Sequence, residues 1–143
     1  ATVTNAVGHL TTLSNYDPHG HVGRISDPNG VVTDLTYSPR GWLINRSLTA
    51  AGATEITHYD YYGVGQVKKI TLPDASVISY SYDDAHRLTD ITDSLNNRIH
   101  YTLDNMGNRI KEEIKDPSGN LARQTTRVVD ALKRVQQITA GHQ

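Results

Sequence analysis

Histidines and aspartates are the residues of this chain whose types and spacing could support chemistry. His19 and His21 stand two apart in the segment HGH, and imidazole nitrogens placed so closely can share a metal ion. They flank a glycine that is typical of a turn, while His58, His86 and His100 lie far away in the sequence. We therefore interpret the histidines as turn and surface residues, and we expect neither a metal site nor a bound cofactor.

An aspartate that recurs along the chain is the second candidate. A column of carboxylates could carry out acid–base work, but an active site needs one distinct constellation rather than several equivalent ones. Asp followed by Gly is typical of a turn, because the carboxylate accepts backbone N–H groups and glycine adopts positive φ. We expect turn-capping aspartates, no catalytic residue and no enzyme. The aspartates concerned are Asp17, Asp60, Asp83, Asp104 and Asp130.

These aspartates belong to a repeat that sets their positions. The unit reads Tyr-Asp-x-x-Gly-x-aliphatic-x-x-Ile-Thr and recurs with a period of about 22 residues. In one copy, Val64-Gly65 forms an extra pair after Gly63, which we interpret as an inserted bulge. The signature residues are Tyr16, Asp17, Gly20, Tyr37, Gly41, Tyr59, Asp60, Gly63, Tyr82, Asp83, Asp104, Gly107 and Asp130.

A second turn signal falls between successive copies of the unit. DPNG (27–30), LPDA (72–75) and DPSGN (116–120) carry it strongly, and TAAGA (49–53) and SLNN (94–97) carry it more weakly. A turn every 11 residues or so leaves about seven residues for each strand. The sequence therefore predicts an all-β array of repeated β-hairpins.

Two local features leave alternatives open. The aliphatic-x-x-Ile spacing of three puts two apolar residues on opposite faces of a regular strand, so either both faces are partly covered or a bulge intervenes. In the final stretch, 126–139, helical spacing of apolar residues competes with the strand prediction. Alignment of VDALKRVQQIT with YDDAHRLTDIT favours strand there.

Composition excludes several classes of function. With 14 basic and 15 acidic residues the net charge is -1, so the chain has no electrostatic footprint for nucleic acid. No apolar run approaches the ~20 residues that span a bilayer, and without cysteine there is no disulfide. Apolar residues make up 36%, which predicts a thin core. We expect one repeat array over 1–143, with about five full units and partial ends, cut from a longer polypeptide.

The segments YDPHG…VGRISDPNG, YSYDDAHRLTDIT and LDNMGNRI…DPSGN resemble the YD repeat of Rhs proteins, of insecticidal toxin complex shell subunits and of teneurins. The resemblance implies hairpins joined edge to edge into a curved ribbon, part of a spiral shell or barrel. Departures from the repeat are Leu103 and Val129 at Tyr positions, Ser38 at an Asp position, and His86 and Lys133 at Gly positions. These units should have degenerate turns.

The same resemblance implies a structural role. We expect a shell segment of a secreted or envelope-associated bacterial toxin, whose partners are the remaining repeats and an enclosed C-terminal toxin domain. The alternative is a carbohydrate- or receptor-binding adhesion module that uses its Tyr-rich face, with Trp42 and Tyr80 as possible glycan contacts. Exposed strand edges would also allow self-association.

Overall fold

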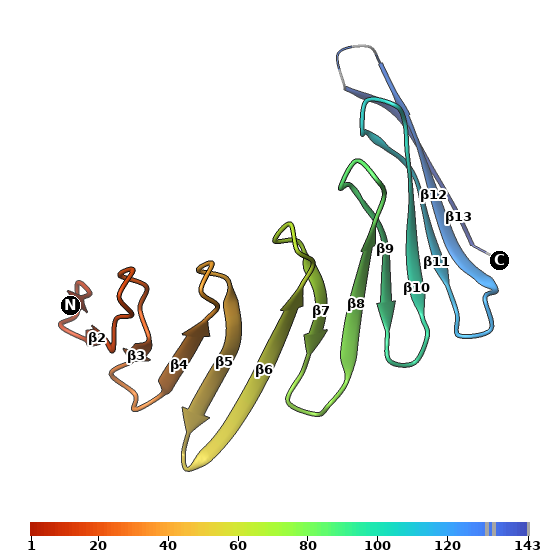
Figure 1. Ribbon diagram of the computed structural model, residues 1–143. Helices are drawn as coiled ribbons and strands as arrows, with labels where there is room; N and C mark the ends of the chain where they lie inside the picture. Colours follow the sequence, from red (N-terminus) through yellow and green to blue (C-terminus); the bar gives the residue numbers. More distant parts are fainter. Residues whose placement is uncertain (131, 133, 143) are drawn as a thin grey trace. The chain divides into compact units, whose positions relative to one another are not determined.

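The computed structural model describes residues 1–130, 132 and 134–142, and within them it contains thirteen β-strands and no helix (Figure 1). Residues 1–75 and 76–143 form two compact units. The first contains β1 (Thr2–Thr4), β2 (Leu10–Ser14), β3 (Arg24–Ser26), β4 (Val32–Tyr37), β5 (Leu43–Ala50), β6 (Ala53–Tyr61) and β7 (Val67–Thr71). The second contains β8 (Val77–Tyr82), β9 (Leu88–Asp93), β10 (Arg98–Leu103), β11 (Arg109–Lys115), β12 (Leu121–Val129) and β13 (Val135–His142).

Within each unit, every strand pairs antiparallel with the strand that precedes it in the chain. The prediction of an all-β hairpin array is therefore confirmed. The final stretch is strand and not helix where the structure describes it, because β12 and β13 pair from Arg123 to Val129. Among the described residues, none forms a helix of the length and apolarity that a membrane span requires.

A β-bulge explains how the aliphatic residue and the isoleucine of the repeat can share a face although they are three residues apart. In β6 and β7 the register shifts between Asp60 and Tyr61, so that Tyr59 faces Ile70 and Tyr61 faces Val67. Tyr59 and Tyr61 are two apart and share a face, so Val67 and Ile70 share it too. The same shift occurs at the end of β4, β8, β10 and β12.

Each unit is a sheet of one layer, with little buried interior. Among the described residues, only Tyr101 and Thr125 are buried, with 8% and 6% of their surface exposed. The Arg109 guanidinium covers the Tyr101 ring at 3.5 Å from its centroid. Since a sheet normally buries one face against a second layer, most of the stabilisation here must come from contacts along the sheet.

Candidate functional site

Most of the turns share one hydrogen-bonded form of five residues, whereas β5 and β6 are joined through Ala51 and Gly52 alone. The N–H of the first residue donates to the carbonyl of the fifth, and its own carbonyl accepts from the N–H of the fourth. In the 104–108 turn, Asp104 Oδ1 also accepts the N–H groups of Met106 and Asn108 at 2.9 and 2.8 Å. The fourth residue, Gly107, has a φ of 83°. This form occurs at both ends of the hairpins, including the turns that begin at Asp27, Asp93 and Asp116.

The fifth residue of the turn also takes part in the cap, which the sequence analysis did not predict. Its side chain donates to the second carboxylate oxygen of the capping aspartate, as in Arg87 Nε to Asp83 Oδ2 at 2.7 Å. These hydrogen bonds lower the pKa of Asp83, and of Asp104 through Asn108. A polar residue directly after the Gly position was the available signal. The residues are His21, Arg87, Asn97, Asn108, Asn120 and Arg134.

One copy of the repeat was assigned in the wrong register. Asp60 lies inside β6, where Lys69 stands 3.1 Å from its carboxylate and lowers its pKa. The turn instead spans 62–66, with Tyr62 first and Gly65 fourth at a φ of 92°. Gly63 is not among the glycines with positive φ. The predicted insertion of Val64-Gly65 was therefore wrong, because the backbone turn aligns on Gly65.

The substituted copies keep the turn. Ser38 Oγ accepts the Trp42 N–H at 3.1 Å in place of an aspartate. His86 takes the fourth position with a φ of 61°, and the same backbone hydrogen bonds form around it. The prediction of degenerate turns is thus wrong for these two copies and for the Leu103 copy, whose 104–108 turn is fully formed, while Lys133 lies outside the described residues.

Tyrosines just before the turns connect one hairpin to the next. The Tyr37 hydroxyl donates to the Val22 carbonyl at 3.1 Å, and the Tyr61 hydroxyl donates to the Leu43 carbonyl at 2.8 Å. Burial raises the pKa of Tyr61. Tyr16, by contrast, is 46% exposed. Leu103 and Val129 have no hydroxyl for such a bond.

Side chains of one turn also lie on the glycine of the next turn at the same edge. A Cβ built on Gly41 would come within 3.0 Å of the His21 ring, and one on Gly65 within 3.0 Å of the Trp42 ring. In the second unit, Arg87 lies beside Gly107 and donates to the Asp104 carbonyl at 3.0 Å. We call these contacts and the tyrosine hydrogen bonds the interlock. It joins successive hairpins within each unit.

Trp42 and Tyr80, the possible glycan contacts, are both half-buried. The Trp42 ring lies 5.4 Å from the Tyr61 ring, and the Arg40 guanidinium stands 5.2 Å from its centroid. Tyr80 lies in β8 and pairs with Ile91 of β9. Packing thus accounts for the position of Trp42, and the sugar contact stays a prediction.

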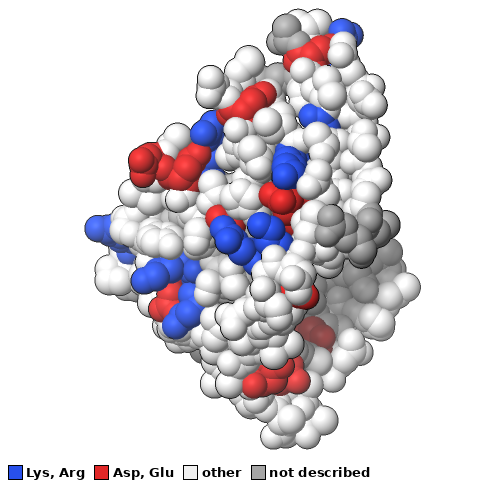
Figure 2. Space-filling model, turned by 90° about the vertical axis from the view of Figure 1, so that its right-hand side faces the viewer, with Lys and Arg blue, Asp and Glu red and all other residues white. Residues whose placement is uncertain are grey.

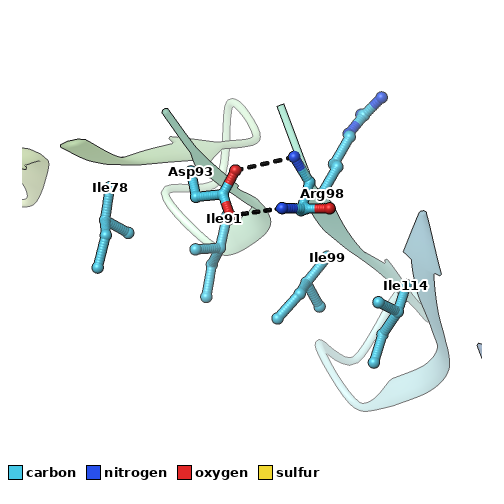
Figure 3. A pocket seen from close by; sticks show the side chains of 7 residues that line it. Ile78, Ile91, Asp93, Arg98, Ile99 and Ile114 are labelled. Carbon is cyan, nitrogen blue, oxygen red and sulfur yellow. Dashed lines mark hydrogen bonds between the residues drawn. The ribbon is translucent and has the colours of Figure 1, made fainter. Parts of the chain in front are cut away.

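An apolar groove lies on one face of the second unit. Ile78, Ile91, Ile99 and Ile114 project to the same side from β8, β9, β10 and β11 (Figure 3). The groove has a volume of about 270 Å³, and Asp93, Asn97 and Arg98 stand at its border. An apolar sheet face of this kind is where a second layer normally packs.

In each unit, charged side chains on neighbouring strands compensate one another. Arg24 pairs with Asp34 at 2.6 Å in the first unit, and Asp90 accepts hydrogen bonds from Arg98 and His100 in the second. Burial alone would raise the pKa of Asp90, but those hydrogen bonds outweigh it and lower the pKa. Figure 2 shows basic and acidic residues side by side on the face in view. This pattern suits a surface that faces water.

Comparison with known proteins places the chain in a structural context. A family model described as RHS Repeat matches residues 16–55, 59–97 and 82–121. A comparison with curated proteins gives no significant match.

Several solved structures are similar to the chain. They include TcdB2-TccC3 with Cdc42 and TcdB2-TccC3 alone, each with a TM-score of 0.78 and 21% identity over 89% of this chain. A Tc holotoxin pore of Photorhabdus luminescens gives a TM-score of 0.69 and 16% identity over 94% of the chain. This chain spans 7% of the first two and 9% of the third. At these identities the likeness shows the fold.

Proposed function

The chain belongs to the RHS repeat family, and on that premise we propose that it is a structural segment of the shell of a secreted or envelope-associated bacterial Rhs-type toxin. Its partners would be the remaining repeats of the parent chain and a C-terminal toxin domain enclosed by the shell. The observation that carries the proposal is the interlocked, one-layer sheet of each unit, which has almost no interior of its own.

The proposed mechanism is physical containment. Within each unit, hairpin hydrogen bonds and the interlock join the strands into a piece of wall, and the charge-compensated face would meet water. The apolar face, which includes the groove of the second unit, would lie against enclosed or neighbouring polypeptide. A structural role also fits the repetition of the aspartates, because each capping carboxylate is committed to its own turn.

Proteolysis of the full-length parent protein tests containment. The C-terminal domain should resist a protease inside the intact shell and be cleaved when expressed alone. Replacing both Tyr37 and Tyr61 by Ala should weaken the wall and speed cleavage, whereas Tyr16→Ala should not. Equal cleavage of the C-terminal domain with and without the repeats would contradict the proposal.

The alternative of a glycan- or receptor-binding module stays a prediction at Trp42 and Tyr80. Because the Trp42 ring contacts Tyr61 and Arg40, replacement by Ala would also disturb the interlock. Tyr80→Ala is the cleaner variant for a glycan-array experiment. Sugar binding that Tyr80→Ala abolishes would favour this second function.

A further inference from the structure

The first turn of the signature gathers three metal-ligand groups. Asp17, His19 and His21 each offer one ligand atom, and these atoms lie within 4.8 Å of one another. Among the described residues, no other group of three His, Cys, Asp or Glu side chains meets this condition. The sequence alone favoured turn histidines, because it could not show how the side chains converge.

The His21 ring is fixed with one nitrogen facing Asp17. It stacks on Tyr37 with 4.8 Å between ring centroids, and its Nε2 edge lies against Gly41. Its Nδ1 therefore points to Asp17 Oδ2 at 2.8 Å. That hydrogen bond holds the His21 ring and the Asp17 carboxylate next to each other.

The backbone of the turn fixes the carboxylate. Asp17 Oδ1 accepts the N–H groups of His19 and His21, both at 2.9 Å, which leaves Oδ2 directed at the His21 ring. The side chains of Asp17 and His21 are 27% and 38% exposed, so an ion can reach them from solvent.

The second imidazole lies slightly beyond the distance that joint coordination requires. The His19 and His21 ring centroids are 6.1 Å apart with an interplanar angle of 35°. Two imidazoles that share a Zn²⁺ through bonds of about 2 Å have centroids roughly 5–6 Å apart. Because His19 is exposed, a small side-chain rotation would bring it into the coordination sphere.

We propose that Asp17, His19 and His21 form a surface site for a divalent transition-metal ion, with Zn²⁺ as its representative. Two imidazoles and one carboxylate suit Zn²⁺, Cu²⁺ or Ni²⁺, whereas Ca²⁺ and Mg²⁺ prefer oxygen ligands. The ion would replace the hydrogen bond between His21 Nδ1 and Asp17 Oδ2, and the proton of that bond would be released to water. A fourth position stays open to water.

Equivalent turns show why the site is specific to this copy. The 104–108 turn has Met106 and Asn108 where the first turn has His19 and His21, and the 83–87 turn has Ala85 and Arg87. Those turns keep the capping aspartate but have no imidazole at the third or the fifth position. They serve as internal controls in the same molecule.

Calorimetric titration of the untagged chain with ZnCl₂ tests the proposal. One equivalent should bind, and His19→Ala should weaken binding by more than about tenfold, since losing even an outer-shell partner of a metal ligand costs 10–100-fold. Asp17→Asn keeps an oxygen that caps the turn and should also weaken binding. His9→Ala, in an exposed turn of the same unit, should leave it unchanged.

Amide NMR spectra locate the bound ion. The shifts on adding Zn²⁺ should be confined to the 17–21 turn and its contacts Tyr37 and Gly41. The proposal is overturned if the wild-type chain binds no equivalent of Zn²⁺, or if His19→Ala binds it as tightly as the wild type.

Discussion

In many of the capped turns, a single aspartate accepts hydrogen bonds on both carboxylate oxygens. Asp104 receives two backbone N–H groups on Oδ1 and the Asn108 amide on Oδ2 at 2.7 Å. Such a cap satisfies turn donors that would otherwise depend on water. Aspartate therefore recurs at many of the turns, while Ser38 and Tyr62 begin two of the others.

Asp104→Ala should destabilise the second unit. The substitution removes all three acceptor contacts, and we expect the melting temperature to fall by roughly 3–5 °C for a chain of this size. Thermal denaturation followed by circular dichroism measures the change. Asp84→Ala, at an exposed second position of the 83–87 turn, is the matched control. An equal fall for both variants would contradict a specific capping role.

Acid should unfold the protein through these caps. Hydrogen bonds from His21, Arg87, Asn97, Asn108 and Asn120 lower the pKa values of their partner aspartates in the folded state. A lowered folded pKa gives stability that is present above the unfolded value of about 3.9 and is lost as the pH falls through the folded value.

Melting curves between pH 7 and pH 2.5 check this dependence. The melting temperature should hold steady down to roughly pH 5 and decline below about pH 4. Asp104→Asn, which cannot ionise at this position, should reduce the decline. A melting temperature that rises or stays level down to pH 2.5 would show that the caps contribute nothing through their charge.

Hairpins become a continuous element through the interlock. A two-stranded hairpin is only marginally stable by itself in water. Here, contacts with the neighbouring hairpin add to its stability. The tyrosine hydroxyl bonds to a carbonyl of the preceding hairpin, and the fifth turn residue lies on the following glycine. The repeat consensus thus records contacts between hairpins as well as within them.

Tyr61→Phe isolates the hydroxyl contribution. The variant keeps the ring against Trp42 but loses the 2.8 Å hydrogen bond to the Leu43 carbonyl. We expect a loss of about 1 kcal/mol in the free energy of unfolding, the usual net value of one hydrogen bond. Urea denaturation provides the measurement, and Tyr16→Phe should change nothing. Equal changes in the free energy of unfolding at the two positions would show that the Tyr61 hydroxyl does not contribute to the interlock.

A comparison of Gly65→Ala with Gly63→Ala tests which glycine occupies the fourth position of the 62–66 turn. Gly65 has a φ of 92°, and a Cβ there would approach the Trp42 ring to 3.0 Å, whereas a Cβ on Gly63 would meet no atom within 4 Å. Alanine at Gly65 should cost about 1–2 kcal/mol from backbone strain alone. At Gly63 it should change stability by less than about 0.5 kcal/mol. A larger loss of stability for Gly63→Ala than for Gly65→Ala would support the register that the sequence suggested, with Gly63 at the turn position.

Some of the turns and strand contacts could be predicted from the sequence, and others could not. Asp, Pro and Gly act locally, so the turns at 17–21 and 116–120 could be recognised from the sequence. The turn at 62–66 could not, because Tyr62 replaces the aspartate and Tyr59-Asp60 imitates the signature. Bulges and the stacking of His21 on Gly41 depend on register between strands, which no single segment specifies.

The last strand of the chain, β13, is an exposed edge strand. Val135 and Ile138 in β13 are 52% and 62% exposed, and β13 pairs with β12 alone among the described strands. An edge strand with free backbone groups and apolar side chains recruits other chains. In the proposed shell, further repeats would cover this edge.

The isolated chain should therefore self-associate. Light scattering after size-exclusion chromatography should show oligomers whose share rises with concentration. Val135→Lys and Ile138→Lys together should shift the population toward monomer, because lysine on an edge strand opposes pairing. The surface pair Lys68→Ala and Glu55→Ala is a control within the first unit. A strictly monomeric wild-type chain at all concentrations would contradict the expectation.

Electron cryomicroscopy of the full-length parent protein tests the central claim most directly. We predict a closed β-sheet wall in which residues 1–143 form consecutive interlocked hairpins, with separate density for a C-terminal domain inside. The repeats would then line the enclosed space with one face and meet solvent with the other. Hairpins that pack around a solid core of their own, or a C-terminal domain that lies outside the wall, would contradict the account.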